Sequence, residues 1–294
     1  MAELYGDQAA GLRRLFGTPQ LRIVSFASGC AGVGKSLSVI NLATILAGQG
    51  REVVVFDENA EAGVPAFYGA PLEGDLLQVV HGERSLAEVM LRVAPGIRVL
   101  PAARLVRRLS RLSELEQRVL VDCLGEIEPP VEVILVDTSL DHPLAFSPLG
   151  LAADDTVVVV TPDPAAITDA YALIKKVSLG YARKDFRILV NQARSPGAAR
   201  AIHDRMAGLT GSRRLARLDY AGYVPFDERL DQAARLCQPV SALFPDAPAA
   251  SAYRRLVGEL LSWPAGRDGP ARLGNFVQLL LHLSQRSDPA AIYA

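Results

Sequence analysis

Ser28-Gly29-Cys30-Ala31-Gly32-Val33-Gly34-Lys35-Ser36 is the stretch that decides the fold of this 294-residue chain. A largely apolar run at 21–27 precedes it, and a run with helical spacing follows at 37–47. The stretch matches the phosphate-binding pattern G-x-x-x-x-G-K-[ST] in the strand–loop–helix context that the pattern requires. A glycine-rich turn without a ligand is the alternative, but residue types, spacing and flanking elements together favour a phosphate-binding loop.

Each part of this loop has an expected role toward a nucleoside triphosphate. Main-chain N–H groups converge on phosphate oxygens, and the N-terminus of the following helix adds the positive end of its dipole. Lys35 would reach the β- and γ-phosphates, and the Ser36 hydroxyl would bind Mg²⁺. The predicted nucleotide-binding residues of the loop are Gly29, Cys30, Ala31, Gly32, Val33, Gly34, Lys35 and Ser36.

The composition excludes several classes of protein. Half of the residues are hydrophobic and 21% are charged, as expected for a soluble globular protein. A net charge of −1 gives no basic excess, so no direct nucleic-acid partner is expected. Three widely spaced cysteines indicate neither a disulfide framework nor a zinc site. Without a leader-like segment or a run of about 18 apolar residues, the expected location is the cytoplasm.

Apolar runs alternate with helical segments along the chain. Besides the run before the loop, continuous apolar runs that predict buried strands lie at 52–56, 97–100, 131–136, 156–160 and 186–190. Helices are predicted at 37–47, 85–93, 110–127, 167–179 and 198–209. This alternation predicts an α/β fold, a P-loop domain whose mostly parallel central sheet has helices on both faces.

Polar residues end three of the predicted strands, at Asp57, Asp137 and Asn191. Ligands on such sheets bind at the carboxyl ends of the strands. Asp137 stands where a Walker B carboxylate belongs and would hold Mg²⁺ through water, which makes Ser36 and Asp137 the predicted metal ligands. An aspartate that only caps the next turn is the alternative for both Asp57 and Asp137.

The loop and residues 53–59 resemble those of the MinD/ParA-type deviant-Walker ATPases, which usually have Lys-Gly-Gly-Val-Gly-Lys-[Ser/Thr] and Asp-x-Asp there. Three further stretches resemble the flagellar number regulators of that family, the FlhG/FleN group. They are Asp7-Gln8-Ala9-Ala10-Gly11-Leu12-Arg13, Thr161-Pro162-Asp163-Pro164 with 167–171, and 222–228 with Pro239-Val240 and Phe244-Pro245. The resemblance therefore spans the chain from residue 7 to residue 246.

The resemblance implies an ATP-binding switch with ATP and Mg²⁺ as cofactors and an ATP-dependent homodimer. It also implies a partnership with the signal-recognition-type GTPase that places flagella, and restraint of a flagellar transcriptional activator. Lys35, Asp57 and Asn59 would be the catalytic residues. Asn191 would bind adenine, because its amide offers both a donor and an acceptor; an asparagine in a strand-end turn is the alternative.

Two positions depart from the family pattern. The family's signature lysine, which reaches the phosphates of the partner subunit, is Cys30 here, and the next glycine is Ala31. Another cation replaces it, or the dimer is weaker. Beside a helix N-terminus, one interpretation is that the pKa of the Cys30 thiol is lowered; the alternative is that Cys30 is merely a tolerated small residue. The second acid of Asp-x-Asp is Asn59, which cannot accept a proton from water, while strand alternation should turn Glu58 away. Hydrolysis is therefore expected to be slow, below about one turnover per second.

These departures leave two other functions open. One is a nucleotide-binding scaffold with little or no hydrolysis, which Cys30 and Asn59 favour. The other is a different ParA/MinD-type positioning ATPase, for which the 7–13 motif would have no purpose.

The two ends of the chain form separate segments beside the ATPase domain at 19–263. In the N-terminal segment, 1–18, Tyr5, Ala9, Leu12 and Phe16 share a helical face that is marginal in isolation. By resemblance this segment docks on the flagellar GTPase and stimulates it; packing on the chain's own body is the alternative. The predicted partner-binding residues are Asp7, Gln8, Ala9, Leu12 and Arg13.

A breaker-rich linker at 264–271 leads to a C-terminal amphipathic helix and tail at 272–294. Leu273, Phe276, Val277, Leu280, Leu281 and Leu283 share one broad face of this helix. Related ATPases use such a helix to lie on the inner face of the cell membrane. Docking on the protein's own surface is the alternative.

Overall fold

The computed structural model of the chain describes residues 21–59, 63–71, 73–127, 130–140, 146–264 and 272–286. Within these ranges the strands are β1 (Arg22–Ala27), β2 (Val53–Asp57), β3 (Leu91–Ala94), β4 (Ile97–Pro101), β5 (Val133–Asp137), β6 (Asp155–Val160), β7 (Asp185–Ala193) and β8 (Arg217–Pro225). They form one sheet in the order β3-β4-β2-β5-β1-β6-β7-β8. All neighbouring pairs are parallel except the antiparallel β3–β4 hairpin. The predicted α/β fold with a mostly parallel sheet is confirmed.

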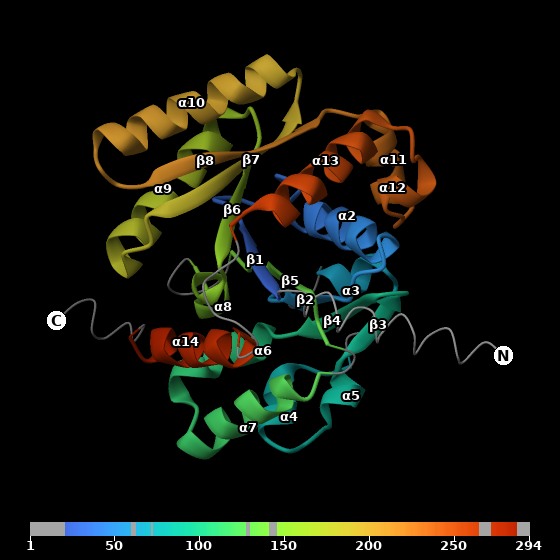
Figure 1. The fold of residues 1–294 in the computed structure, drawn as a ribbon, viewed down its shortest axis with the longest axis vertical. Coiled ribbons are helices and arrows are strands. Elements are labelled where there is room, and N and C mark those ends of the chain that lie inside the picture. Colours follow the sequence, from blue (N-terminus) through green and yellow to red (C-terminus); the bar gives the residue numbers. More distant parts are fainter. Residues whose placement is uncertain are drawn as a thin grey trace.

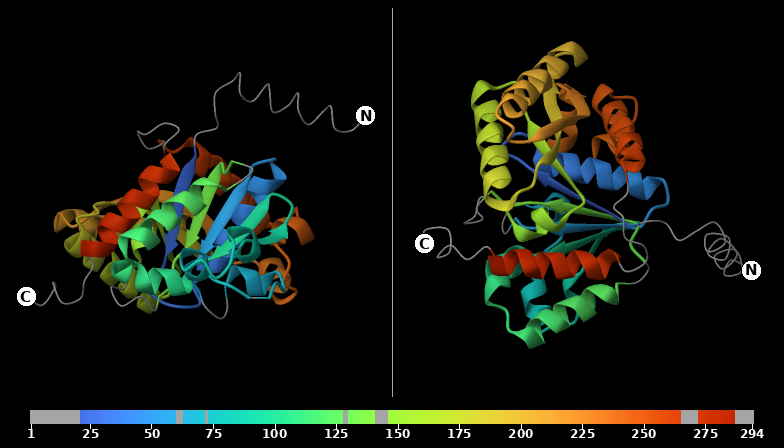
Figure 2. Two further views of the ribbon diagram at one scale, coloured as in Figure 1. Left: turned by 90° about the horizontal axis from the view of Figure 1, so that it is seen from below. Right: turned by 60° about the vertical axis from the view of Figure 1, so that its left-hand side comes forward.

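Helices cover both faces of this sheet (Figures 1 and 2). One face carries α2 (Lys35–Gly48), α3 (Val64–Phe67), α11 (Glu228–Arg235), α12 (Val240–Leu243) and α13 (Pro248–Ser262). The opposite face carries α4 (Leu76–Val80), α5 (Leu86–Val89), α6 (Ala103–Arg108), η1 (Leu109–Arg111), α7 (Glu114–Gly125), α8 (Pro148–Ala152), α9 (Pro164–Tyr181), α10 (Pro196–Ser212) and α14 (Arg272–Arg286). Both faces of the central strands are therefore buried, which explains their continuous apolar runs.

Two predicted helices were wrong in extent. The segment predicted as a helix at 85–93 divides into the short α5 and the edge strand β3. The reason is local: Gly96 has φ 72° and closes the turn that pairs β3 with β4. The helix predicted at 110–127 begins only at Glu114, because Ser113 caps it and the Glu116 side chain returns to the Ser113 backbone.

Strand β8 and helix α13 had not been predicted. In β8, buried Leu218, Ala221 and Val224 are separated by polar or half-exposed residues, so the segment lacks the continuous apolar run of the other strands. Helix α13 packs against α2 and β8 through buried residues that include Tyr253 and Val257. Together β8 and α13 complete the sheet on the side away from the β3–β4 hairpin.

The C-terminal helix α14 docks on the protein's own surface, against α7, α8 and η1 (Figure 1). Phe276, Val277, Leu280 and Leu281 are buried there, and the rings of Phe276 and Phe56 lie 6.3 Å apart. Of the two placements considered for this helix, the structure therefore shows the intramolecular one. No helix within the described ranges is long and apolar enough to cross a membrane. Residues 1–18 and most of the linker lie outside the described residues.

Candidate nucleotide-binding site

The phosphate-loop sequence connects β1 to α2 at the carboxyl edge of the sheet, and close contacts require glycine at two of its positions. Gly34 has φ 82°, and a Cβ at this position would collide with the side-chain amide of Asn191. A Cβ on Gly29 would collide with the backbone of α9 at Asp169. Glycine fits both positions because it has no Cβ, and at position 34 it also adopts the positive φ without strain.

Lys35, the first residue of α2, forms a buried ion pair with Asp137, the last residue of β5. The Lys35 side chain is 8% exposed and that of Asp137 is fully buried. Each side chain is thus the counterion of the other. A phosphate bound by Lys35 would share the ammonium with Asp137, so a divalent cation beside Asp137 would offset the added negative charge.

Asn59 bridges the two aspartates at the strand ends. Its Nδ2 donates to Asp57 Oδ1 at 2.8 Å and to Asp137 Oδ2 at 2.9 Å, and its backbone N–H donates to Asp57 Oδ1 at 2.9 Å. Asp57 and Asp137 lie opposite each other on neighbouring parallel strands. The amide therefore separates two carboxylates that would otherwise repel each other. This bridging role of Asn59 has no signal in the sequence, where the residue shows only as the replacement for the second acid of Asp-x-Asp.

The carboxyl group of Asp57 is buried as well. Burial, and next the charge of Asp137, raises the pKa of Asp57 to about 6, although hydrogen bonds from Asn59 and Val64 oppose the rise. The Val64 N–H donates to Asp57 Oδ2 at 2.6 Å, and a Cβ on neighbouring Gly63 would collide with that carboxylate. Sequence analysis missed these two positions; the only signal was a glycine six residues after Asp57.

Glu58 points to the opposite face of the sheet, as strand alternation predicted. It is 3% exposed, and its carboxylate accepts hydrogen bonds from the Ser139 N–H at 2.9 Å and from the Ser147 hydroxyl. Ser147 caps α8, accepting from the Gly150 N–H at 3.0 Å. Glu58 thus joins the end of β2 to the start of α8, the helix on which α14 packs.

Burial raises the pKa of Glu58 from 4.5 to about 7, against the hydrogen bonds from Ser147 and Ser139. A carboxyl whose folded-state pKa is raised contributes full stability below its unfolded value, and that stability falls as the pH rises through the folded value. Glu58→Gln should therefore match the natural protein near pH 4. Its free energy of unfolding should exceed that of the natural protein by up to about 3 kcal/mol above pH 7. Chemical denaturation across pH 4–8 measures this, with exposed Glu126→Gln as the control; equal stability at pH 8 would refute the prediction.

Two other predicted ligands have groups left for a nucleotide and a metal. The Ser36 side chain is half-buried, and its hydroxyl makes no hydrogen bond to another described residue. Asn191 Nδ2 donates to the Val33 carbonyl at 2.8 Å, while its buried Oδ1 lacks a donor among the described residues. Asn191 does not end its strand as predicted, because β7 continues to Ala193. These free oxygens, together with Lys35 and Asp137, fit Mg·ATP chemically.

The expectation of a lowered pKa for Cys30 was wrong. Burial, and next the negative charges of Asp169 and Asp163 on and before α9, raises the pKa of the thiol. Cys30 is therefore a protonated side chain at neutral pH and supplies no charge to the loop.

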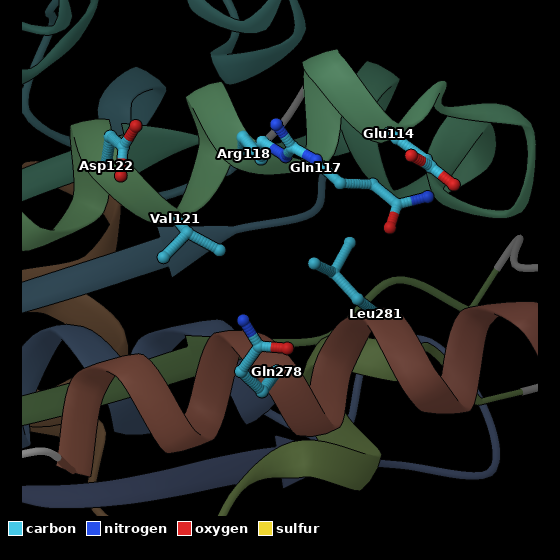
Figure 3. Close-up of a pocket in the computed structure, with 7 residues that line it drawn as sticks. All are labelled: Glu114, Gln117, Arg118, Val121, Asp122, Gln278 and Leu281. Atoms are coloured by element: carbon cyan, nitrogen blue, oxygen red, sulfur yellow. The ribbon is translucent and has the colours of Figure 1, made fainter.

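A separate groove of about 460 Å³ lies between α7 and α14, away from the phosphate loop. Figure 3 shows Val121 of α7 and Leu281 of α14 directed into the space between the two helices, with charged and amide side chains around them. The groove is lined by side chains of both charges, by two amides and by Val121 and Leu281. The groove is part of the interface through which α14 packs on α7.

The fold and the loop place the protein among the P-loop nucleotide-binding proteins with a mostly parallel sheet. Within that class, the chain belongs to the family of the CobQ/CobB/MinD/ParA nucleotide binding domain, which matches residues 24–240. The resemblance stated from the sequence is therefore confirmed at the family level.

Individual relatives narrow the comparison. The chain is 30% identical to the antiactivator FleN of Pseudomonas aeruginosa over 262 residues, covering 89% of this chain and 94% of FleN. It is 31% identical to the flagellum site-determining protein YlxH of Helicobacter pylori, covering 63% of each chain. Among solved structures, the MinD cell division protein of Aquifex aeolicus matches 84% of this chain and all of that one, with a TM-score of 0.61 and 20% identity. This last likeness shows the fold.

Proposed function

We propose that this protein is an ATP-dependent switch that regulates the number and placement of flagella. The similarity to FleN over nearly the whole chain carries the flagellar part of the proposal. The buried Lys35–Asp137 pair behind a phosphate loop supports ATP as its ligand.

Different residues at the carboxyl edge of the sheet would bind the phosphates, the adenine and the metal of Mg·ATP. Backbone N–H groups of 29–36 and the Lys35 ammonium would hold the phosphates, and Asn191 would contact adenine. Ser36 and Asp137 would hold Mg²⁺, which neutralises charge on the β- and γ-phosphates when bound. Asp57, with its raised pKa, and Asn59 would position the attacking water.

Asn59 is the reason to expect slow hydrolysis. Its amide is engaged by both carboxylates, and an amide accepts no proton. The same contacts favour a second candidate function, a nucleotide-binding scaffold without useful turnover. Measured turnover separates the two candidates: a rate well below one per minute favours the scaffold, whereas a faster rate that is still below about one per second favours the slow switch.

The carboxyl edge also offers a surface for an ATP-bound homodimer. Leu140 follows β5 and Phe226 follows β8 at this edge, and both side chains are exposed. Association of two subunits at this edge would remove these two side chains from water. A dimer formed there would bring the second subunit close to Cys30, where the family's lysine is missing.

The first test measures the oligomeric state of the full chain by sedimentation velocity with Mg·ATP, with Mg·ADP and without nucleotide. A dimer only with Mg·ATP supports the switch, and an unchanged monomer in all three refutes it.

The second test measures GTP turnover of the flagellar GTPase with the full chain and with a variant lacking 1–18. The shortened chain should dimerise normally yet give no stimulation; equal stimulation by both chains would refute the partner role of 1–18.

Reversible association with the inner face of the cell membrane is also part of this proposal. In the structure the apolar face of α14 is buried against α7 and α8. The helix must therefore dissociate from α7 and α8 before its apolar face can contact lipid. The seven-residue stretch 265–271, which precedes it, contains two glycines and one proline.

A further inference from the structure

Four arginines form an exposed face next to the surface on which α14 packs. Residues 103–112 contain four arginines and no acidic residue, in a chain whose net charge is −1. Arg104, Arg107, Arg108 and Arg111 follow the i, i+3, i+4, i+7 spacing of one helical face across α6 and η1. All four side chains are exposed, while Leu105, Val106 and Leu109 fill the opposite, buried side. We call these four residues the arginine face.

Most of the charges of this face are not neutralised by ion pairs within the described part of the protein. Arg107, Arg108 and Arg111 form no ion pair with any described residue. Arg104 differs, because burial raises the pKa of the Asp75 carboxyl group and the charge of Arg104 opposes that rise, so the tests below leave it intact. Two arginines in the last turn of α6 also suit the helix dipole, but that stabilisation does not require four.

The position of the face identifies its partner. Helix α14 packs directly against η1, so the arginine face adjoins the amphipathic helix that is proposed to contact the membrane (Figure 1). The sequence of α14 itself has only Arg272 and Arg286 at its two ends, too few for strong attraction to anionic lipid. The fold supplies the missing cations from a segment about 170 residues earlier in the chain.

We propose that the arginine face binds the phosphates of an anionic lipid surface, and that it is the electrostatic half of a membrane-binding surface whose apolar half is α14. This inference rests on the proposed membrane association. Arginine suits the role because its planar guanidinium donates two parallel hydrogen bonds to a phosphate. Neither half suffices alone, since stable anchoring takes an apolar element together with a basic patch.

The test is co-sedimentation of the full chain, loaded with Mg·ATP, with vesicles of phosphatidylcholine alone or with 30% phosphatidylglycerol. The natural protein should bind the anionic vesicles more tightly, and salt should weaken the binding. Arg107→Gln, Arg108→Gln and Arg111→Gln combined should lower the partition coefficient about a hundredfold, given the attraction of each basic residue to such a surface. The corresponding triple lysine variant keeps the charge and should retain most of the binding.

The matched control is Lys175→Gln, Lys176→Gln and Arg205→Gln combined, which makes the same change in net charge on exposed positions of α9 and α10. It should bind anionic vesicles like the natural protein. Thermal unfolding verifies that each variant is folded. If both triple glutamine variants lose binding equally, or if the natural protein binds neutral and anionic vesicles alike, the arginine face is not the lipid site although membrane association stands. If the natural protein binds no vesicle, the proposed membrane association fails as well.

Discussion

Lys35→Ala should remove Mg·ATP binding and, at the same time, destabilise the nucleotide-free protein. The first effect follows from the loss of charge-assisted contacts to the phosphates, which should weaken binding by at least about a hundredfold. The second follows from the structure, because alanine leaves the fully buried Asp137 without its counterion. Removing one partner of a buried ion pair costs about 3 kcal/mol or more. In a domain of this size the melting temperature should fall by roughly 5 °C or more.

A double variant separates the two effects. Lys35→Ala combined with Asp137→Ala removes both charges, so much of the lost stability should return while Mg·ATP binding stays absent. Exposed Lys176→Ala is the matched control and should change neither property. Titration calorimetry measures binding and differential scanning calorimetry measures stability. If Lys35→Ala melts like the natural protein, the ion pair does not contribute as described, and if it binds Mg·ATP normally, the loop is not the nucleotide site.

Asn59→Asp should make stability depend on Mg²⁺ and should speed hydrolysis. The new carboxylate would face Asp57 Oδ1 and Asp137 Oδ2, where the natural amide donates at 2.8 and 2.9 Å. Three carboxylates in one buried cluster should cost about 3 kcal/mol or more without metal at pH 8, and the cost should shrink as the pH falls and the cluster gains a proton. Mg²⁺ should recover most of the loss, because it neutralises the cluster. The second acid of the family's Asp-x-Asp would also be restored, and turnover should rise about tenfold or more.

Asn59→Ala is the control for this prediction. It removes the same two hydrogen bonds without adding a charge, so it should lose stability without gaining either Mg²⁺ dependence or turnover. Melting curves with and without Mg²⁺, and a phosphate-release assay, give the comparison. An aspartate variant whose melting temperature ignores Mg²⁺ would show that the metal binds elsewhere.

The central strands were predictable because their burial on both faces leaves continuous apolar runs, as in β2 and β5. The edges of the sheet were not. In β8 the buried residues stand three apart, separated by two half-exposed ones, and the short β3 resembles the last turn of a helix until it pairs with β4. Such strands depend on a partner far along the chain or on a turn, so a local pattern cannot identify them.

The loop and the two strand-end aspartates could be located because phosphate chemistry fixes residue types and spacing. The bridging amide of Asn59 and the contact of Glu58 with Ser147 could not, since each joins segments 78 to 89 residues apart. The environment of Cys30 was missed for the same reason, because the carboxylates that act on it belong to α9 and the turn before it. Electrostatic surroundings of this kind arise only once the chain has folded.

The mutual neutralisation of Lys35 and Asp137 has a thermodynamic consequence for loading. Free ATP alone would add negative charge beside Asp137 and draw on its counterion, and a free divalent ion alone would add positive charge beside Lys35. Binding of either ligand alone therefore has an electrostatic cost, whereas binding of both together leaves Lys35 and Asp137 each with an oppositely charged neighbour. Nucleotide and metal should consequently show positive cooperativity, each improving the affinity of the other by one common factor.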